Sequence, residues 1–173
     1  MIAAKPHEYA KDLHQKYGST IPIDVYAIAE GEGVHVEEVD LEPNVSGFLV
    51  LKEDEVVIGV NKNHHPYRKR FTIAHELGHH LIHGAMAASN VMTEEGELVF
   101  FRDQASESGE IEQERQANQF AADLLMPKDL LKTLVPTKIR MTDETSIRKL
   151  AVKFDVSFAA MSFRLSALKL LHS

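Results

Sequence analysis

The stretch that decides the fold is His75-Glu76-Leu77-Gly78-His79. On an α-helix, His79 lies about 40° around the axis from His75 and Glu76 lies about 100° from it, so the three side chains share one face. Two neutral imidazoles from successive turns can bind one metal ion, and the carboxylate between them then reaches a water at the ion rather than the ion itself. The spacing predicts a hydrolytic zinc site on a helix.

The opposite face of this predicted helix is apolar. Ile73, Ala74, Leu77, Gly78 and Leu81 recur at helical spacing, which predicts a back that packs into a core while the front carries the ligands. A glycine inside a helix costs about 1 kcal/mol relative to alanine. The presence of Gly78 therefore predicts that another element approaches the helix closely at this point.

The composition narrows the class of protein. A chain of 173 residues with 44% hydrophobic residues is long enough for one well-packed domain and short for two. The absence of cysteine excludes disulfides and thiolate zinc sites, which leaves histidines and carboxylates as metal ligands. No apolar run approaches the roughly 18 residues that span a bilayer, and residues 1–17 contain no apolar core of a signal peptide. We therefore expect a soluble, cytoplasmic protein without a membrane partner.

The charge of the chain bears on nucleic-acid binding. A net charge of -7 argues against nonspecific binding to nucleic acid, which depends on the neutralisation of phosphates by Lys and Arg. The densest basic cluster, Arg68-Lys69-Arg70, directly precedes the metal-site helix. Ion pairing or solvation of this cluster is favoured over a DNA contact, so direct nucleic-acid binding is not expected.

The first half of the chain alternates helical and extended patterns. Two helices are predicted first, at Pro6–Tyr17 and Pro22–Glu30, each followed by a glycine. Three apolar runs then predict strands, which we expect to form a small antiparallel meander ahead of the metal-site helix. The runs are Val34–Val39, Gly47–Leu51 and Val56–Val60. These elements predict an α+β fold.

The second half is mainly helical. Residues 84–109 lose periodicity apart from a strand-like run at Leu98–Phe101, and we interpret this segment as either a loop or a flap over the site. A helix is predicted from Ser108 to Met126, where a proline follows. Later helices are predicted at Lys128–Leu134, at Asp143–Lys153 and from Ser157 toward Leu171. We expect a domain of residues 1–135 with a helical extension of residues 136–173 packed on it, or one single domain.

The two histidines need a third ligand, since a catalytic zinc usually takes three protein ligands and keeps a fourth position for water. The helix predicted to end at Met126 offers Glu110, Glu112 and Glu114. Glu114 lies at the edge of the apolar arc of this helix, and small alanines in that arc would let the helix approach the metal-site helix. Glu110 lies on a similar face, whereas Glu112 lies on the opposite side. Periodicity ranks Glu114 first and leaves Glu110 open.

Two stretches carry a family resemblance. Residues 70–79, RFTIAHELGH, and residues 114–127, ERQANQFAADLLMP, resemble the two signature blocks of the ImmA/IrrE metallopeptidases. The resemblance extends to the Gly47 strand, to Val60-Asn61 and to the C-terminal pattern between Leu150 and Leu165, so it covers most of the chain. It implies a zincin-like α+β fold, a zinc-dependent endopeptidase, and a helix-turn-helix repressor or antitoxin as its protein target. It also implies that Glu114 is the third zinc ligand.

The residues also predict how a peptide bond would be cut. Zinc held by His75, His79 and Glu114 would lower the pKa of a water toward about 7 and polarise the scissile carbonyl. Glu76 would accept the proton of the attacking water as general base and pass it to the leaving amine. Asn118 lies one turn after the third ligand, and we interpret it either as a hydrogen-bond partner of a ligand or as an ordinary buried amide.

Other polar side chains near the motif are weaker candidates for metal binding or catalysis. For His83, a structural role is favoured over the roles of spare metal ligand and oxyanion donor. Tyr67, His65 and His83 are the candidates for stabilising an oxyanion, and none of them stands out. His80 and His64 are not expected to bind the metal.

Two further segments bear on substrates and partners. The strand at Val56–Val60 is expected to present a free sheet edge to which an extended substrate adds. The helices at Glu144–Lys153 and Ser157–Leu171 outline a helix-turn-helix, with Asp155 where glycine is common in the turn. Their basic residues are spread out, so core completion or partner docking is favoured over DNA reading.

One alternative function belongs to a different class. The chain could be a toxin or regulatory binding protein of a toxin-antitoxin or stress-response pair, in which partner binding rather than proteolysis is the main activity. Stable association with an intact, uncut partner would distinguish this alternative from an endopeptidase.

Overall fold

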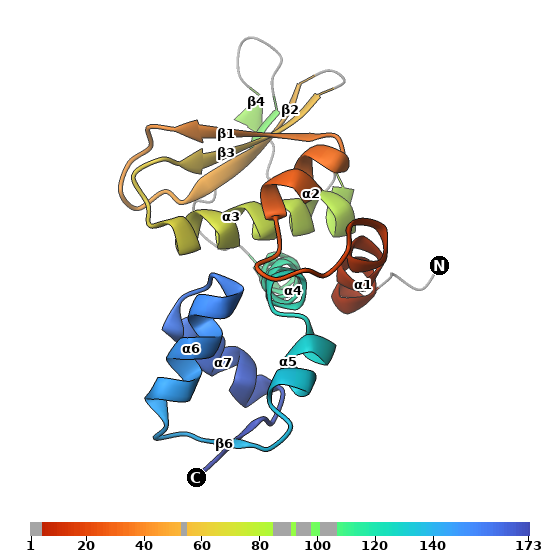
Figure 1. The fold of residues 1–173 in the computed structure, drawn as a ribbon. Helices are drawn as coiled ribbons and strands as arrows, with labels where there is room; N and C mark the ends of the chain where they lie inside the picture. Colours follow the sequence, from red (N-terminus) through yellow and green to blue (C-terminus); the bar gives the residue numbers. More distant parts are fainter. Residues whose placement is uncertain (1–4, 53–54, 85–90, 93–97, 101–106) are drawn as a thin grey trace.

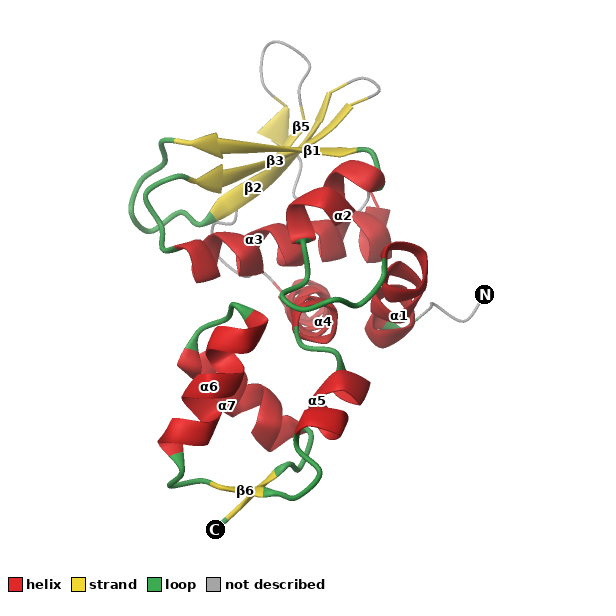
Figure 2. Ribbon diagram, viewed as in Figure 1, coloured by secondary structure: helices red, strands yellow, loops and turns green. Residues whose placement is uncertain are grey.

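The computed structural model describes residues 5–52, 55–84, 91–92, 98–100 and 107–173. A sheet and its covering helices form one part of the molecule, and a group of helices forms the other (Figures 1 and 2). The helices are α1 (Pro6–Tyr17), α2 (Val25–Gly31), α3 (Pro66–Gly78), α4 (Glu107–Leu125), α5 (Lys128–Leu134), α6 (Glu144–Phe154) and α7 (Phe158–Ala167), and the π-helix η1 (His79–His83) directly follows α3. The strands are β1 (Val34–Val39), β2 (Gly47–Lys52), β3 (Glu55–Asn61), β4 (Val91–Met92), β5 (Leu98–Phe100), β6 (Ile139–Arg140) and β7 (Leu171–His172).

The fold is the predicted zincin-like α+β class, but the sheet differs from the predicted meander. Its strand order is β1-β3-β2-β5-β4, and β1 pairs parallel with β3. β2 pairs antiparallel with both β3 and β5. The strand β3 therefore lies inside the sheet, and its continuous buried run at Ile58–Asn61 is typical of an internal strand. The all-antiparallel arrangement is wrong, and so is the prediction that Val56–Val60 offers a free edge to a substrate.

A buried asparagine holds the connection between β1 and β2. Asn61, at the end of β3, has no exposed surface. Its Nδ2 lies 3.2 Å from the carbonyl oxygen of Leu41, 3.0 Å from that of Glu42 and 2.9 Å from that of Val45. These carbonyls lie in a loop, where no strand partner satisfies them. Asn61 thus fixes the crossover that makes the first strand pair parallel.

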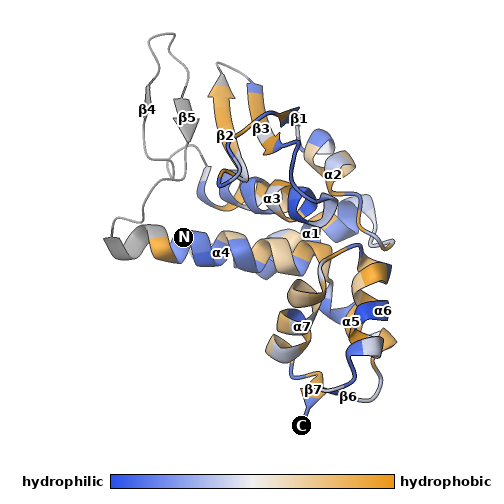
Figure 3. Cartoon of the chain, turned by 90° about the vertical axis from the view of Figure 1, so that its left-hand side faces the viewer, coloured by the Kyte–Doolittle hydropathy of each residue, from blue (hydrophilic) through white to orange (hydrophobic). Residues whose placement is uncertain are grey.

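Helices α2 and α3 cover one face of the sheet, and α4 crosses beneath α3, so that Figure 1 views α4 along its axis and Figure 3 views it from the side. The predicted apolar back of α3 is buried, since Ile73, Ala74 and Leu77 have no exposed surface. Leu81, on η1, packs against the same core. The helix therefore has the predicted arrangement, with its apolar side in the core and its histidines on another side.

Side-chain caps set the start of both C-terminal helices. The carboxylate of Asp143 accepts a hydrogen bond of 3.1 Å from the N–H of Ser146 at the start of α6. The hydroxyl of Ser157 accepts one of 3.1 Å from the N–H of Ala160 at the start of α7. Such caps satisfy backbone donors that have no partner inside the helix. Both starts agree with the sequence prediction.

Two predicted helix bounds are wrong. Helix α2 starts at Val25 rather than Pro22, because the Asp24 carboxylate caps it. Helix α7 ends at Ala167, because Lys169 takes a positive φ of 58° and the next residues pair with β6. Elsewhere the match is close, and the strand-like run at Leu98–Phe101 contains β5. The loop-or-flap interpretation of residues 84–109 falls largely outside the described residues.

Two arginines fasten the C-terminal helices to the rest of the chain. On α7, Arg164 is 4% exposed, and it donates hydrogen bonds to the carbonyl of Met126 (3.0 Å) and to Oδ1 of Asp123 (2.6 Å). On α3, Arg70 donates to the carbonyl of Asp155 (3.1 Å) and lies 3.2 Å from its carboxylate. Asp155 takes the left-handed conformation, with φ 54° and ψ 51°. The bonds to Arg70 account for an aspartate where glycine is common.

Two predictions concern the chain as a whole. In the part of the chain that the structure describes, no helix combines the length and apolarity needed to cross a membrane. The predicted boundary at residue 135 falls directly after α5. The division into two units at that boundary stays a prediction.

Candidate metal centre

Helices α3 and α4 approach each other closely at Gly78. A Cβ atom placed on Gly78 would lie 2.8 Å from Cδ1 of Phe120 and 3.4 Å from Cα of Ala117. Both neighbours are fully buried, so neither has free space into which it could move. The glycine has the packing role that the sequence predicted, and it brings the polar sides of the two helices together.

Three polar side chains converge where the helices cross. The ligand atoms of His75, His79 and Glu114 all lie within 4.8 Å of one another. The two Nε2 atoms are 3.0 Å apart, and Glu114 oxygens lie 3.0 Å from His79 Nε2 and 3.5 Å from His75 Nε2. Two imidazole nitrogens and one carboxylate form the donor set of a three-ligand zinc site with a position left for water. These three residues can hold a metal ion.

Asn118 sets the orientation of His75. Its Oδ1 atom lies 2.9 Å from Nδ1 of His75, whose residue is 2% exposed. An amide oxygen only accepts hydrogen bonds, so Nδ1 carries the proton and Nε2 keeps its lone pair for a ligand. Asn118 itself is exposed, which does not agree with the interpretation as an ordinary buried amide. Its contact is the one expected of a group that orients a metal-binding histidine.

Glu76 is the buried carboxylate that stands between the two histidines in the sequence motif. It is 7% exposed and follows His75 on α3. The cluster of possible ligands contains Glu114 and the two histidines but not Glu76. The assignment of Glu76 to the water rather than to the metal stays a prediction.

The helix widens into η1 at His79, a feature that the sequence did not predict. π-Helical turns are frequent at functional sites, but no residue type in His79–His83 signals one. Nε2 of His83 lies 3.2 Å from the carbonyl oxygen of Gln113 on α4. Burial lowers the pKa of His83, so the neutral ring donates this hydrogen bond. His83 links η1 to α4, in agreement with the structural interpretation.

The structure does not bring Tyr67 or His65 to this cluster. Nδ1 of His65 accepts a hydrogen bond from the N–H of Tyr67 at the start of α3, and the two rings are 4.5 Å apart. Helical rise places Tyr67 about 12 Å before His75 along the axis. Neither side chain is therefore placed as an oxyanion donor beside the three ligands. His80 and His64 also lie outside the cluster, as expected.

The sequence also offered Glu110 and Glu112 of α4 as third ligands, and the structure describes the side chain of Glu112 alone. Glu112 is exposed, and its Oε1 accepts a hydrogen bond of 2.6 Å from Arg115. Hydrogen bonds from Arg115 and Gln116 lower the pKa of Glu112 to about 2. Glu112 is thus an ion-paired surface residue. The side chain of Glu110 lies outside the described residues.

Comparison with known proteins adds to this geometry. A family model, the IrrE N-terminal-like domain of the M78 peptidases, matches residues 29–166. The chain belongs to this family. Membership in the IrrE N-terminal-like family supports a metallopeptidase-like function, and the matched range contains α3, η1 and α4, which carry the converging side chains.

A solved structure shares the fold of this IrrE N-terminal-like chain. It is a Mycobacterium tuberculosis transcriptional regulator, similar with a TM-score of 0.63 and 20% sequence identity. The similarity covers 93% of this chain and 46% of that one, so the chain spans about half the length of the regulator. At this identity the likeness concerns the fold alone. None of the curated proteins matches the chain.

Proposed function

We propose that the chain is a zinc endopeptidase that cleaves a specific DNA-binding regulator. The observation that carries this proposal is the convergence of His75, His79 and Glu114 on one point between α3 and α4. Imidazole and carboxylate ligands suit zinc, whereas magnesium and calcium prefer oxygen ligands throughout. Membership in a peptidase family supports a peptide bond as the site of reaction.

The proposed mechanism assigns each side chain one task. A zinc ion in this position would lower the pKa of water toward neutrality and polarise the scissile carbonyl. His75 is held by Asn118 with its Nε2 lone pair directed toward the ligand cluster. Glu76 accepts the proton of the attacking water and transfers it to the leaving amine. The burial of Glu76, which is 7% exposed, limits exchange of that proton with bulk water.

The target that we propose is a helix-turn-helix repressor or antitoxin in the cytoplasm. The resemblance to ImmA/IrrE metallopeptidases supports this choice. Helix α7, the second of the two C-terminal helices, is poorly suited to reading DNA. The one basic residue of α7, Arg164, is 4% exposed and bonded to Asp123. Without an exposed cation, α7 lacks the Arg and Lys contacts to phosphates that recognition helices commonly make.

The basic cluster ahead of the metal centre is engaged in the same manner. Lys69 pairs with Glu38 at 2.9 Å, and Arg70 pairs with Asp155 at 3.2 Å. Arg68 donates to the hydroxyl of a serine in the loop before β2. These contacts agree with the predicted ion pairing, and they support a protein rather than a nucleic acid as the partner.

The test is cleavage of a defined regulator. Each helix-turn-helix regulator encoded in the gene neighbourhood is incubated with the zinc-loaded protein, and the products are analysed by mass spectrometry. We expect one cut by the wild type and a loss of rate of about 10²–10⁴-fold in Glu76→Gln, with unchanged zinc content. A regulator that forms a stable complex with the zinc-loaded wild type and stays intact would overturn the proposal in favour of a binding protein.

A further inference from the structure

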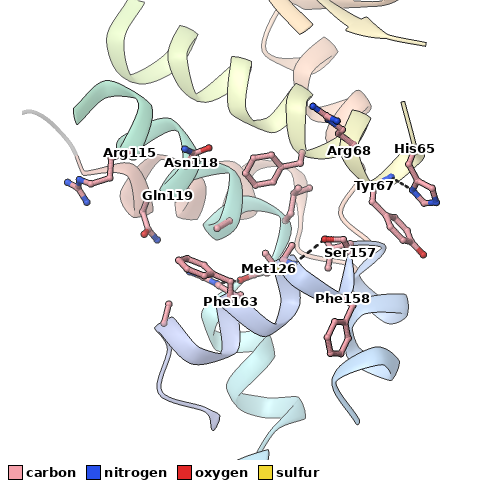
Figure 4. Close-up of a pocket in the computed structure, with 17 residues that line it drawn as sticks. His65, Tyr67, Arg68, Arg115, Asn118, Gln119, Met126, Ser157, Phe158 and Phe163 are labelled. Atoms are coloured by element: carbon pink, nitrogen blue, oxygen red, sulfur yellow. Dashed lines mark hydrogen bonds between the residues drawn. The ribbon is translucent and has the colours of Figure 1, made fainter. Parts of the chain in front are cut away.

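A large apolar groove lies between α3, α4 and α7 (Figure 4). Its volume is about 930 Å³, which is the size of pockets that enclose most of a bound organic ligand. Helices α4 and α7 each contribute one face, with residues that recur at helical spacing. The residues that matter most are Ala122 and Leu125 on α4, and Ala160, Phe163 and Ala167 on α7.

The groove adjoins the candidate metal centre. Asn118 lines the groove, and its Oδ1 atom lies 2.9 Å from Nδ1 of His75. Phe71, one turn before His75 on α3, also lines the groove, and its ring centroid lies 6.2 Å from that of the imidazole. A polypeptide bound in the groove therefore passes beside one of the proposed zinc ligands. This position suits the residues that flank a scissile bond.

The chemistry of the groove favours apolar side chains. Alanines of α4 and α7 leave space between larger apolar residues. Large apolar side chains of a partner can occupy these spaces. Phe163 is 79% exposed, and an exposed aromatic ring in a groove is a typical anchor for a binding partner. Two lining arginines are already paired with carboxylates, Arg164 with Asp123 and Arg115 with Glu112. These pairs leave those two arginines poorly placed to attract an acidic ligand.

Hydrogen bonds and an ion pair connect the helices that line the groove. Arg164 ties α7 to α4 through bonds to Met126 and Asp123, and Arg70 ties α3 to the turn before α7. The three helices are thus held at fixed separations, and a preformed groove loses less conformational entropy on binding than a mobile one. The opening between α4 and α7 is therefore bordered by helices that these bonds hold together.

We infer that this groove binds an apolar segment of the protein substrate, with at least two large aliphatic or aromatic side chains, next to the peptide bond that is cut. The inference rests on the proposed endopeptidase function and adds the selection of the substrate to it. It assigns substrate selection to α7, the helix that a helix-turn-helix would use to read DNA.

The test separates binding from cutting. Random displayed peptides are selected on the zinc-loaded Glu76→Gln protein, which is expected to hold substrates without cleaving them. We expect selected peptides to carry paired large apolar residues and to lose at least about tenfold in affinity when Phe163→Asp is added. Val152→Asp is the matched control, because Val152 on α6 is 71% exposed and does not line the groove. Peptide affinity in this control stays within about twofold.

A second variant tests whether the loss of peptide affinity is a property of the groove or of Phe163 alone. Ala167 is an exposed lining residue at the end of α7, and Ala167→Glu is expected to weaken the same peptides. Circular dichroism and thermal unfolding verify that each variant is folded. Peptides without apolar enrichment, an equal loss in Val152→Asp, or unchanged affinity in both groove variants would overturn the inference. So would a wild-type dimer that Phe163→Asp dissociates, since the groove would then belong to a second copy.

Cleavage of the selected peptides distinguishes the inference from the proposed function. The zinc-loaded wild type is expected to cut them beside the apolar pair, and the groove variants are expected to cut them more slowly at limiting peptide concentration. If the peptides bind in the groove but are never cleaved, the endopeptidase function is contradicted, and the groove is still supported as an apolar peptide site. If the groove variants cleave the peptides at the wild-type rate, the endopeptidase function is supported and the role of the groove is rejected.

Discussion

Helix α4 faces α3 and α7 in opposite ways. Against α3 the contact is close, because Gly78 leaves no space for a side chain opposite Ala117, and three polar groups converge beside it. Against α7 the helices are separated by a groove of about 930 Å³ and joined by the bond between Arg164 and Asp123. The difference shows how one helix can serve two purposes. A rigid contact positions the candidate ligands, and an open one leaves room for a polypeptide.

The largest effect is expected from Arg164→Met on the open side of α4. This change leaves the Asp123 carboxylate, whose side chain is 14% exposed, without its cation. Removing one partner of a buried ion pair costs about 3 kcal/mol of unfolding free energy, measured by urea unfolding. Zinc affinity of the folded variant should stay within about twofold of the wild type. Equal losses of stability and zinc affinity would show that the two sides of α4 are not independent.

A smaller effect is expected from Gly78→Ala on the close side. The added methyl group would lie 2.8 Å from the buried ring of Phe120. Overpacking of this kind costs about 1–3 kcal/mol, and it should also weaken zinc binding because α3 and α4 must separate. Calorimetric unfolding and zinc titration measure both effects. Adding Phe120→Leu to this variant should restore part of the loss, and no recovery would contradict the proposed contact.

Asn118→Ala tests the orientation of a single ligand. The amide holds Nδ1 of His75 at 2.9 Å, and loss of such a partner typically lowers metal affinity by about 10–100-fold. Stability should change little, because Asn118 is exposed. The neighbouring Gln119→Ala is the control, since Gln119 bonds to Asp123 rather than to a histidine. Competitive zinc titration should separate the two variants, and equal affinities would contradict the role of Asn118.

The smallest effect concerns the cap of α6, far from both sides of α4. Hydrogen bonds from the hydroxyl and the N–H of Ser146 lower the pKa of Asp143. Because the folded pKa lies below the unfolded value, the cap stabilises the fold above the unfolded pKa and is lost as the pH falls through the folded one. Asp143→Asn caps without ionising, so its Tm should fall less than that of the wild type between about pH 5 and pH 2. Parallel Tm profiles of the two metal-free proteins would contradict this.

Sequence reasoning predicted features that depend on local spacing and capping. The bounds of α1 and the starts of α6 and α7 were predictable, because hydrogen bonds to nearby backbone determine them. The convergence of His79 and Glu114 was predictable because each lies at the edge of an apolar helix face, so packing those faces brings the edges together.

Features that depend on distant contacts were not predicted. The parallel pairing of β1 with β3 requires the crossover held by Asn61, although the apolar run in β3 was a signal of an internal strand. The bonds of Arg70 to Asp155 and the groove at Phe163 depend on how α7 lies against α4. Nothing in the spacing of α7 distinguishes an exposed Phe163 from a buried one, because both occur in apolar helices.

The central claim is that Glu114, and not another carboxylate of α4, completes a zinc site with His75 and His79. Competitive zinc titration of Glu114→Ala against Glu112→Ala tests it most directly, because Glu112 lies two residues away and is paired with Arg115. We predict that Glu114→Ala loses more than about 100-fold in zinc affinity while Glu112→Ala binds like the wild type. Wild-type affinity in Glu114→Ala, or equal losses in both variants, would contradict the proposed metal centre.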